Sequence, residues 1–205
     1  MNKLEIIHKT ITDFCIDFVN NPYLCYTEHG QHALFYTKLY TAFPETELYD
    51  MWQQQKVCLL QKEYPTAGKL GKPQRQHWDV SVLSQPLSAN TVHIHSYDYF
   101  ELLAAIEFGL NEPREHLKED MRRLDHPDSN VANGIIVHLY RLSESGLKFS
   151  GRDWTSRSKR IVTLQEVIAL TVNSSCEVYY SLFESTNPQK NGVWHIIRGK
   201  AKKLY

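Results

Sequence analysis

The stretch "AAIEFGLNEP", residues 104–113, decides the fold because it links a buried strand to a helix. A run of small and aliphatic residues, 102–106, leads into Glu107, and Phe108, Gly109 and Leu110 precede a polar segment that starts a helix. With the second apolar strand at 134–142, this pattern predicts a β-α-β unit whose two strands are parallel and joined by a right-handed crossover. A carboxylate at the end of such a strand is costly unless it is paired, hydrogen-bonded or metal-bound, so Glu107 is a candidate functional residue.

Working outward, hydrophobic periodicity and turn residues predict an α/β chain with a single domain over residues 1–205. Thr27, with Glu28 in the first turn, caps the second helix, and Pro113 suits a first helical position. Residues 44–55 are predicted to form a loop with a helical turn. The predicted helices cover 3–20, 27–42, 112–124 and 163–172, and the predicted strands cover 56–64, 77–84, 102–110, 134–142, 176–185 and 192–200.

The overall composition is that of a soluble globular protein. Apolar residues make up 42% of the chain and charged residues 22%, and no run of 18 apolar residues occurs, so no membrane span is expected. The N-terminus has no continuous apolar region of the kind found in signal peptides. The four scattered cysteines form no CxxC pair, which indicates reduced thiols and a cytoplasmic location.

The charge is unevenly distributed along the chain. Residues 1–140 hold 12 basic and 18 acidic residues, a balance of −6, whereas residues 141–205 hold 11 and 5, a balance of +6. In the basic part, 143–205, four side chains surround Trp154 and are predicted to grip a nucleic-acid backbone while the indole stacks on a base. The alternative is a solvated loop. These four residues are Arg152, Arg157, Lys159 and Arg160.

Asp79, in "WDVSV", and Glu107 stand on consecutive predicted strands and are both flanked by core residues. Two such acids on one sheet face offer the hard oxygen ligands that suit Mg²⁺ or Mn²⁺, and such an ion can activate water against a phosphodiester. Each acid also has a purely structural interpretation, in which Asp79 caps a turn or pairs with Arg75 and Glu107 pairs with Lys62.

At these residues the sequence resembles the PD-(D/E)XK nuclease superfamily. The resemblance covers roughly residues 25–142 and rests on an acid-bearing helix followed by "KVCLLQKEYPT", "WDVSV", "AIEFGLNEP" and "EHLKEDMRRL". It implies a restriction-endonuclease-like central mixed β-sheet flanked by helices, and Mg²⁺-dependent hydrolysis of DNA. It also implies a set of metal ligands, namely Asp79, Glu107, the main-chain carbonyl of Phe108, and a further acid from Glu28 or Glu63.

The family's lysine should stand two residues after Glu107, where this chain has Gly109. In the family that lysine orients or deprotonates the attacking water. Lys118 or Lys62 is predicted to substitute for it. Alternatively, the protein has lost catalysis and is a binding module, and a third class, an unrelated structural or dimerisation domain, is expected if Asp79 and Glu107 lie far apart. Many nucleases of this fold are dimers, so a homodimer is compatible with the resemblance.

A second metal hypothesis concerns "HIH", residues 93–95, whose two imidazoles share a strand face. Two histidines without a third ligand are a weak zinc signal, and solvation is the simpler interpretation. His77, two residues before Asp79, would share the face of that acid, although a surface role is the expected one.

Overall fold

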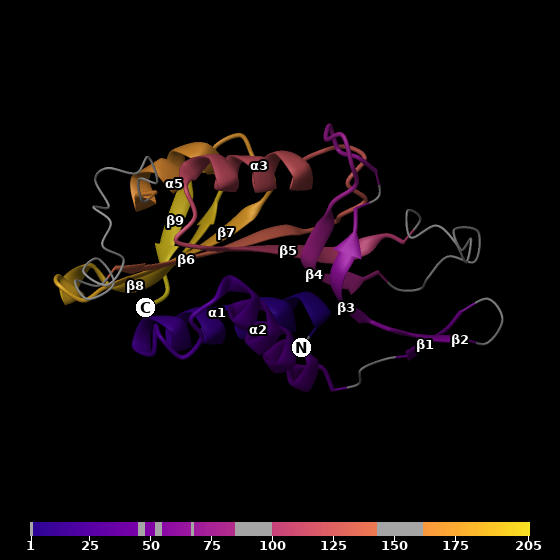
Figure 1. The fold of residues 1–205 in the computed structure, drawn as a ribbon, viewed down its shortest axis with the longest axis horizontal. Coiled ribbons are helices and arrows are strands. Elements are labelled where there is room, and N and C mark those ends of the chain that lie inside the picture. Colours follow the sequence, from indigo (N-terminus) through magenta and orange to yellow (C-terminus); the bar gives the residue numbers. More distant parts are fainter. Residues whose placement is uncertain (1, 45–47, 52–54, 67, 85–99, 143–161) are drawn as a thin grey trace.

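The computed structural model describes residues 2–44, 48–51, 55–66, 68–84, 100–142 and 162–205 (Figure 1). In this part of the chain, a seven-stranded mixed sheet is flanked by helices, as the sequence predicts at the level of fold class. The elements are α1 (Lys3–Asn20), α2 (Glu28–Ala42), β1 (Leu48–Met51), β2 (Gln55–Cys58), β3 (Leu60–Pro65), β4 (His77–Leu83), β5 (Leu102–Leu110), α3 (Arg114–Leu124), β6 (Gly134–Leu142), α5 (Leu164–Thr171), β7 (Glu177–Glu184), η3 (Pro188–Lys190), β8 (Gly192–Ile197) and β9 (Lys200–Lys203).

The sheet has the order β3-β4-β5-β6-β7-β8-β9. Strands β5, β6 and β7 are mutually parallel, whereas the other neighbours pair antiparallel. Parallel neighbours need a crossover connection, and α3 and α5 provide it. The predicted parallel pairing of the 102–110 and 134–142 strands is confirmed. One sheet thus contains strands from both the predicted core, 25–142, and the C-terminal part.

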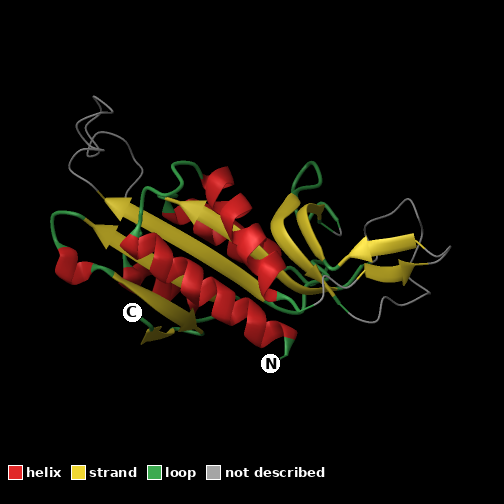
Figure 2. Ribbon diagram, turned by 90° about the horizontal axis from the view of Figure 1, so that it is seen from below, coloured by secondary structure: helices red, strands yellow, loops and turns green. Residues whose placement is uncertain are grey.

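The helices cover the sheet in two layers. Helices α1 and α2 pack on one face, and α3 and α5 lie on the other (Figure 1). Figure 2, seen from the side of α1 and α2, shows helices in front of the sheet, with the long one running along the direction of the strands. Because both faces are covered, the central strands are buried along most of their length, which explains their continuous apolar sequences.

Local sequence signals set most element ends. Thr27 caps α2 by accepting a hydrogen bond from the backbone N–H of Gly30, as predicted. Thr163 caps α5 in a capping box with Glu166, which confirms the threonine cap predicted there. Pro113 is the residue before α3 rather than its first helical residue, a shift of one position.

Two predictions of secondary structure are wrong in detail. Residues 44–55 were predicted as a loop with a helical turn, yet they contribute β1 and the first residue of β2, which form a separate two-stranded sheet (Figure 1). The strand predicted over 192–200 divides into β8 and β9. Arg198 and Gly199 both have positive φ, 46° and 74°, and this reverses the chain in a tight turn.

No helix in the described part of the chain combines the length and the apolar character needed to cross a membrane.

Candidate functional site

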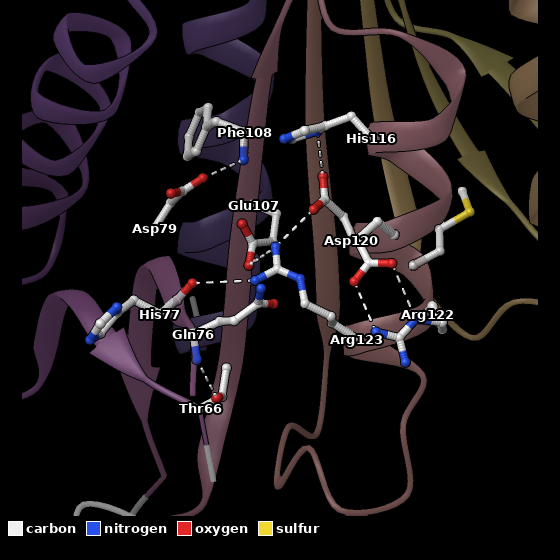
Figure 3. Close-up of polar contacts among 12 residues, drawn as sticks. Thr66, Gln76, His77, Asp79, Glu107, Phe108, His116, Asp120, Arg122 and Arg123 are labelled. Carbon is white, nitrogen blue, oxygen red and sulfur yellow. Dashed lines mark hydrogen bonds and ion pairs between the residues drawn. The ribbon is translucent and has the colours of Figure 1, made fainter. Parts of the chain in front are cut away.

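Strands β4 and β5 separate at the point where both candidate acids lie. Their pairing begins at Val80 and Ile106, while β5 continues beside β6 as far as Leu110. Buried backbone N–H groups need acceptors, and β4 provides none beyond this point. Two carboxylates accept these hydrogen bonds instead of the β4 backbone. Asp79 Oδ2 accepts the Phe108 N–H at 2.8 Å (Figure 3), and Glu28 Oε2 accepts the Leu110 N–H at 2.9 Å. The edge of β5 that β4 leaves unpaired thus holds two acids from distant parts of the chain in place.

Asp79 and Glu107 lie close enough for each carboxyl group to influence the pKa of the other. Burial raises the pKa of Asp79 to about 6, against the lowering effect of the Phe108 N–H, and the charges of Glu28 and Glu63 add to the rise. Burial, and then the charges of Asp79 and Asp120, hold the pKa of Glu107 well above its usual range. The pair therefore favours a shared proton over two charges. The two acids are neighbours, so the large separation that would favour an unrelated structural domain is not found.

Glu28 and Glu63 lie close enough to Asp79 for their charges to raise its pKa. Burial raises the pKa of Glu28 itself. Glu63 has a φ of 53°, a left-handed conformation on β3 between two regularly paired residues. The side chains of Asp79 and Glu28 are 19% and 33% exposed, so an ion can reach them from solvent. We call Glu28, Glu63, Asp79 and Glu107 the carboxylate site; its oxygens are the donors that Mg²⁺ and Mn²⁺ prefer.

His32 belongs to this site, although sequence reasoning missed it. Its side chain is 1% exposed, and its Nε2 lies 3.6 Å from Asp79 Oδ2 and 4.0 Å from Glu28 Oε1. Burial, followed by the charges of His29 and Lys62, lowers the pKa of His32 to about 4. Neither ring nitrogen has a hydrogen-bond partner within the described residues. A neutral imidazole with unused nitrogens can serve as a metal ligand or accept a hydrogen bond from water.

Arg123 brings a fixed positive charge to the acids. Its guanidinium lies between Glu107 Oε1, at 2.9 Å, and Asp120 Oδ1, at 2.8 Å (Figure 3). It also donates to the carbonyl of His77 at 3.5 Å and lies over the ring of Trp78. Burial opposes the charged form of Arg123, but the neighbouring Glu107 and Asp120 raise its pKa overall. Glu107 is buried and pairs with this arginine, which is not the Lys62 pairing considered from the sequence.

The structure gives a steric reason for a glycine at position 109. Gly109 pairs with His138 across β5 and β6, and a Cβ placed on Gly109 would lie 2.5 Å from His138 Nε2. Real Cβ atoms do not approach so closely, so the histidine ring takes up the space into which a side chain at 109 would project. A lysine at this position is incompatible with His138 as it is placed.

The two predicted substitute lysines occupy different surroundings. Lys118 Nζ binds Glu115 Oε1 at 2.9 Å, and the lysine side chain is 42% exposed on α3. This contact replaces the predicted approach to the acids. Lys62 is exposed on β3, and its charge helps to lower the pKa of His32, so it lies at the border of the carboxylate site.

The structure thus places Glu28, Asp79 and Glu107 around the separated edge of β5 and Glu63 within electrostatic range of Asp79, although the four carboxylates do not form one of the groups of described residues whose ligand atoms all lie within 4.8 Å. Phe108 is also present, but its described contact with the site is the N–H bonded to Asp79; the family's carbonyl ligand stays a prediction. His77 is exposed and contributes its backbone carbonyl to Arg123. Several further predictions fall on residues outside the described part of the chain: Arg152, Trp154, Arg157, Lys159, Arg160, His93 and His95.

Comparisons of the chain with protein-family models, curated proteins and solved structures found no match.

Proposed function

We propose that this chain is a divalent-metal-dependent nuclease with a restriction-endonuclease-like fold, and that it hydrolyses phosphodiester bonds in DNA. The observation that carries the proposal is the convergence of Asp79 and Glu107 where β4 and β5 separate, with Asp79 fixed by the Phe108 N–H and each acid influencing the pKa of the other. Such a pair, with Glu28 and Glu63 beside it, is expensive without a compensating cation. The sequence motifs on the same strands agree with this interpretation.

The residues fit a hard divalent cation. Asp79 and Glu107 would hold Mg²⁺ or Mn²⁺, with Glu28, Glu63 and His32 able to complete the set, and the unused nitrogens of buried His32 support this fit. When bound, such an ion lowers the pKa of a water molecule and polarises the phosphoryl oxygens. The Phe108 N–H keeps the Asp79 carboxylate in place. Lys62, at the border of the site, is the better candidate of the two lysines for neutralising a substrate phosphate, because Lys118 is held by Glu115.

A second function is favoured by Arg123. Its guanidinium already binds Glu107 Oε1 at 2.9 Å, so a cation built into the chain partly neutralises the acids. In this alternative the scaffold binds nucleic acid or protein without cleaving a bond. Gly109, which removes the family lysine, supports the same interpretation.

A cleavage assay separates the two functions. The full-length protein is incubated with supercoiled plasmid and with single-stranded DNA, in Mg²⁺ and separately in Mn²⁺. Asp79→Asn is the test variant, since an asparagine oxygen can still accept the Phe108 N–H. Glu177→Gln is the matched control: it also neutralises one partly buried acid, but on β7, and it is purified by the same steps.

The nuclease proposal expects metal-dependent cutting that Asp79→Asn reduces at least ~10-fold, because even the loss of a residue that only supports a metal ligand has a cost of that order, while Glu177→Gln cuts like the wild type. Equal cutting by both variants identifies a contaminant and contradicts the proposal. If the wild type cuts in neither metal, the binding-module alternative replaces the nuclease. A gel-shift measurement with the same two DNAs then tests whether nucleic acid is the bound partner.

A further inference from the structure

Three side chains on the α3 side of the sheet converge without being used by the carboxylate site. His116, Asp120 and His138, hereafter the α3 cluster, each offer a ligand atom, and these atoms all lie within 4.8 Å of one another. His116 Nδ1 and Asp120 Oδ2 form an ion pair at 3.0 Å (Figure 3), whereas His138 Nε2 is buried and has no hydrogen-bond partner within the described residues. Buried polar atoms without partners are rare in folded proteins, so an unpartnered imidazole nitrogen beside an acid and a second imidazole calls for an explanation.

We propose that the α3 cluster binds one transition-metal ion of the Zn²⁺ type, at a site distinct from the Mg²⁺ or Mn²⁺ position at Asp79 and Glu107. Two imidazoles and one carboxylate are a common three-ligand set for zinc, with a fourth position for water. His116 Nδ1 lies 3.0 Å from Asp120 Oδ2 without the alignment of a hydrogen bond. Two ligands of one tetrahedral zinc are about 3.3 Å apart, given metal–ligand distances near 2 Å.

The tautomer of His138 matches this role. The Tyr140 hydroxyl donates to the carbonyl of Glu112 at 2.9 Å, so its oxygen accepts from His138 Nδ1, which lies 3.0 Å away. With Nδ1 protonated, the neutral ring carries its lone pair on Nε2, the atom that has no partner. A metal-binding histidine typically donates its other N–H to a fixed acceptor, because this orients the ring and sets the tautomer.

Local geometry places the other two ligands opposite His138. His116 and Asp120 stand four residues apart on α3, so they share one helix face, and α3 packs on β5 and β6. His138 and Asp120 have side chains that are almost fully buried, whereas His116 is 37% exposed. An ion can therefore reach the cluster when the His116 ring moves.

Gly109 keeps this space open, because any side chain there would meet His138 Nε2. The ion would lie next to Gly109, where the lysine of the resembled family would begin. It would also be linked to the carboxylate site, since the other oxygen of Asp120 binds Arg123, and Arg123 binds Glu107. The inference does not depend on the proposed nuclease activity, because zinc binding is measured without DNA.

Metal-free full-length protein is titrated with Zn²⁺ and the bound metal is counted per chain; Co²⁺ is titrated in parallel, and its visible absorption reports a tetrahedral site with nitrogen ligands. Two variants disturb the cluster differently. His138→Gln removes one ligand, and Gly109→Ala keeps all three but introduces the Cβ that meets Nε2. Far-ultraviolet circular dichroism checks that both variants are folded.

Two control variants test other histidine groups whose ligand atoms also lie close together. His195→Gln alters the group of His8, Glu177 and His195, hereafter the β8 cluster, and His29→Ala alters the group of His29, His32 and Glu63. We expect one zinc ion per chain in the wild type and in both controls. Zinc affinity should fall ~10-fold or more in His138→Gln and in Gly109→Ala.

Several results would overturn the inference. The wild type could fail to bind zinc, in which case a water molecule or a proton accounts for the unpartnered His138 Nε2. Loss of zinc in His29→Ala or His195→Gln, with retention in His138→Gln, would locate the ion elsewhere. If His138→Gln is unfolded, the folded Gly109→Ala variant decides alone, and unchanged zinc binding in it contradicts the site.

Discussion

The α3 cluster and the β8 cluster contain the same kinds of groups, two imidazoles and one carboxylate within 4.8 Å, but they differ in how their atoms are satisfied. In the β8 cluster, His195 Nε2 lies 2.6 Å from Glu177 Oε2, and His8 Nδ1 lies 2.9 Å from the Tyr179 hydroxyl. In the α3 cluster, the buried His138 Nε2 has no hydrogen-bond partner within the described residues. Each cluster also contains a close imidazole–carboxylate pair, since His116 Nδ1 lies 3.0 Å from Asp120 Oδ2, so the buried and unpartnered His138 Nε2 is what distinguishes the candidate metal site from the structural contact.

The acids of the β8 cluster and of the carboxylate site also have pKa values that are shifted in opposite directions. The hydrogen bond from His195 lowers the pKa of Glu177, although burial opposes this. Burial raises the pKa of both Asp79 and Glu107. The β8 cluster therefore stabilises its charge internally, whereas Arg123 neutralises the carboxylate site only in part and the remaining cost falls on a proton or a further cation. Electrostatic cost concentrated in one place is typical of a functional site.

The largest expected loss of stability comes from replacing Arg123, the cation that pairs with the acids. In Arg123→Met, Glu107 and Asp120 lose a buried partner at 2.9 and 2.8 Å. Breaking a buried ion pair typically costs ~3–5 kcal/mol, because the remaining charge has no compensation. The loss should be largest at pH 8 and smaller at pH 5, because burial raises the pKa of Glu107 and its charge is more readily neutralised by a proton at the lower pH. Urea unfolding at both pH values measures it, and an equal loss at both would contradict the electrostatic explanation.

Asp79→Asn, in contrast, should stabilise the protein rather than destabilise it. The folded-state pKa of Asp79, about 6, exceeds its ordinary value of 3.8, so the wild type loses stability as the pH rises from about 4 through about 6. That difference corresponds to up to about 3 kcal/mol. Without divalent metal, the variant should therefore be more stable than the wild type at pH 8 and similar to it at pH 4.

Thermal unfolding at the two pH values, with and without Mn²⁺, tests this prediction. Mn²⁺ should stabilise the wild type more than Asp79→Asn, because the ion favours the charged carboxylate. An Asp79→Asn protein that is less stable than the wild type at pH 8 would mean that the charge of Asp79 is already compensated within the fold.

Much of this architecture follows from local sequence signals. The buried run 102–110, the second run 134–142 and the helix between them were sufficient to predict a parallel pair, because a continuous apolar strand must be covered on both faces. Asp79 and Glu107 were identified because a carboxylate inside an apolar run is conspicuous. β1 and the β8–β9 turn were missed, since the latter depends on a positive φ at Arg198, a residue that rarely signals a turn.

The other site residues were missed because their importance depends on tertiary contacts. His116, Asp120 and Arg123 follow the spacing i, i+4 and i+7, so they share one helix face with Leu117 and Leu124. That buried polar stripe was a signal available in the sequence. His138, in the middle of an apolar strand, was another. Neither pattern could reveal that Gly109 makes room for the His138 ring, since this contact joins two strands far apart in sequence.

Glu177→Gln, in the β8 cluster, should cause a smaller loss of stability. The lowered folded-state pKa of Glu177 contributes stability that is present above its ordinary value of 4.5 and is lost as the pH falls through the folded value. These side chains are about one-fifth exposed, so solvent limits the loss to ~1 kcal/mol, measurable at pH 7 and absent near pH 3. No change in divalent-metal binding is expected; a loss would remove the contrast between the two clusters.

Lys118→Met should change the stability least. It tests whether a residue matters because it lies on α3 or because it belongs to the carboxylate site. Lys118 and Arg123 belong to the same helix, but the lysine pairs with an exposed acid, Glu115, three residues earlier. Such pairs contribute ~0.2–0.5 kcal/mol, so urea unfolding should barely change. Any DNA cleavage should also persist, whereas Lys62→Met, at the border of the carboxylate site, should weaken it. If Lys118→Met abolishes cleavage while Lys62→Met does not, the lysine leaves Glu115 during the reaction, and the family's missing charge comes from α3.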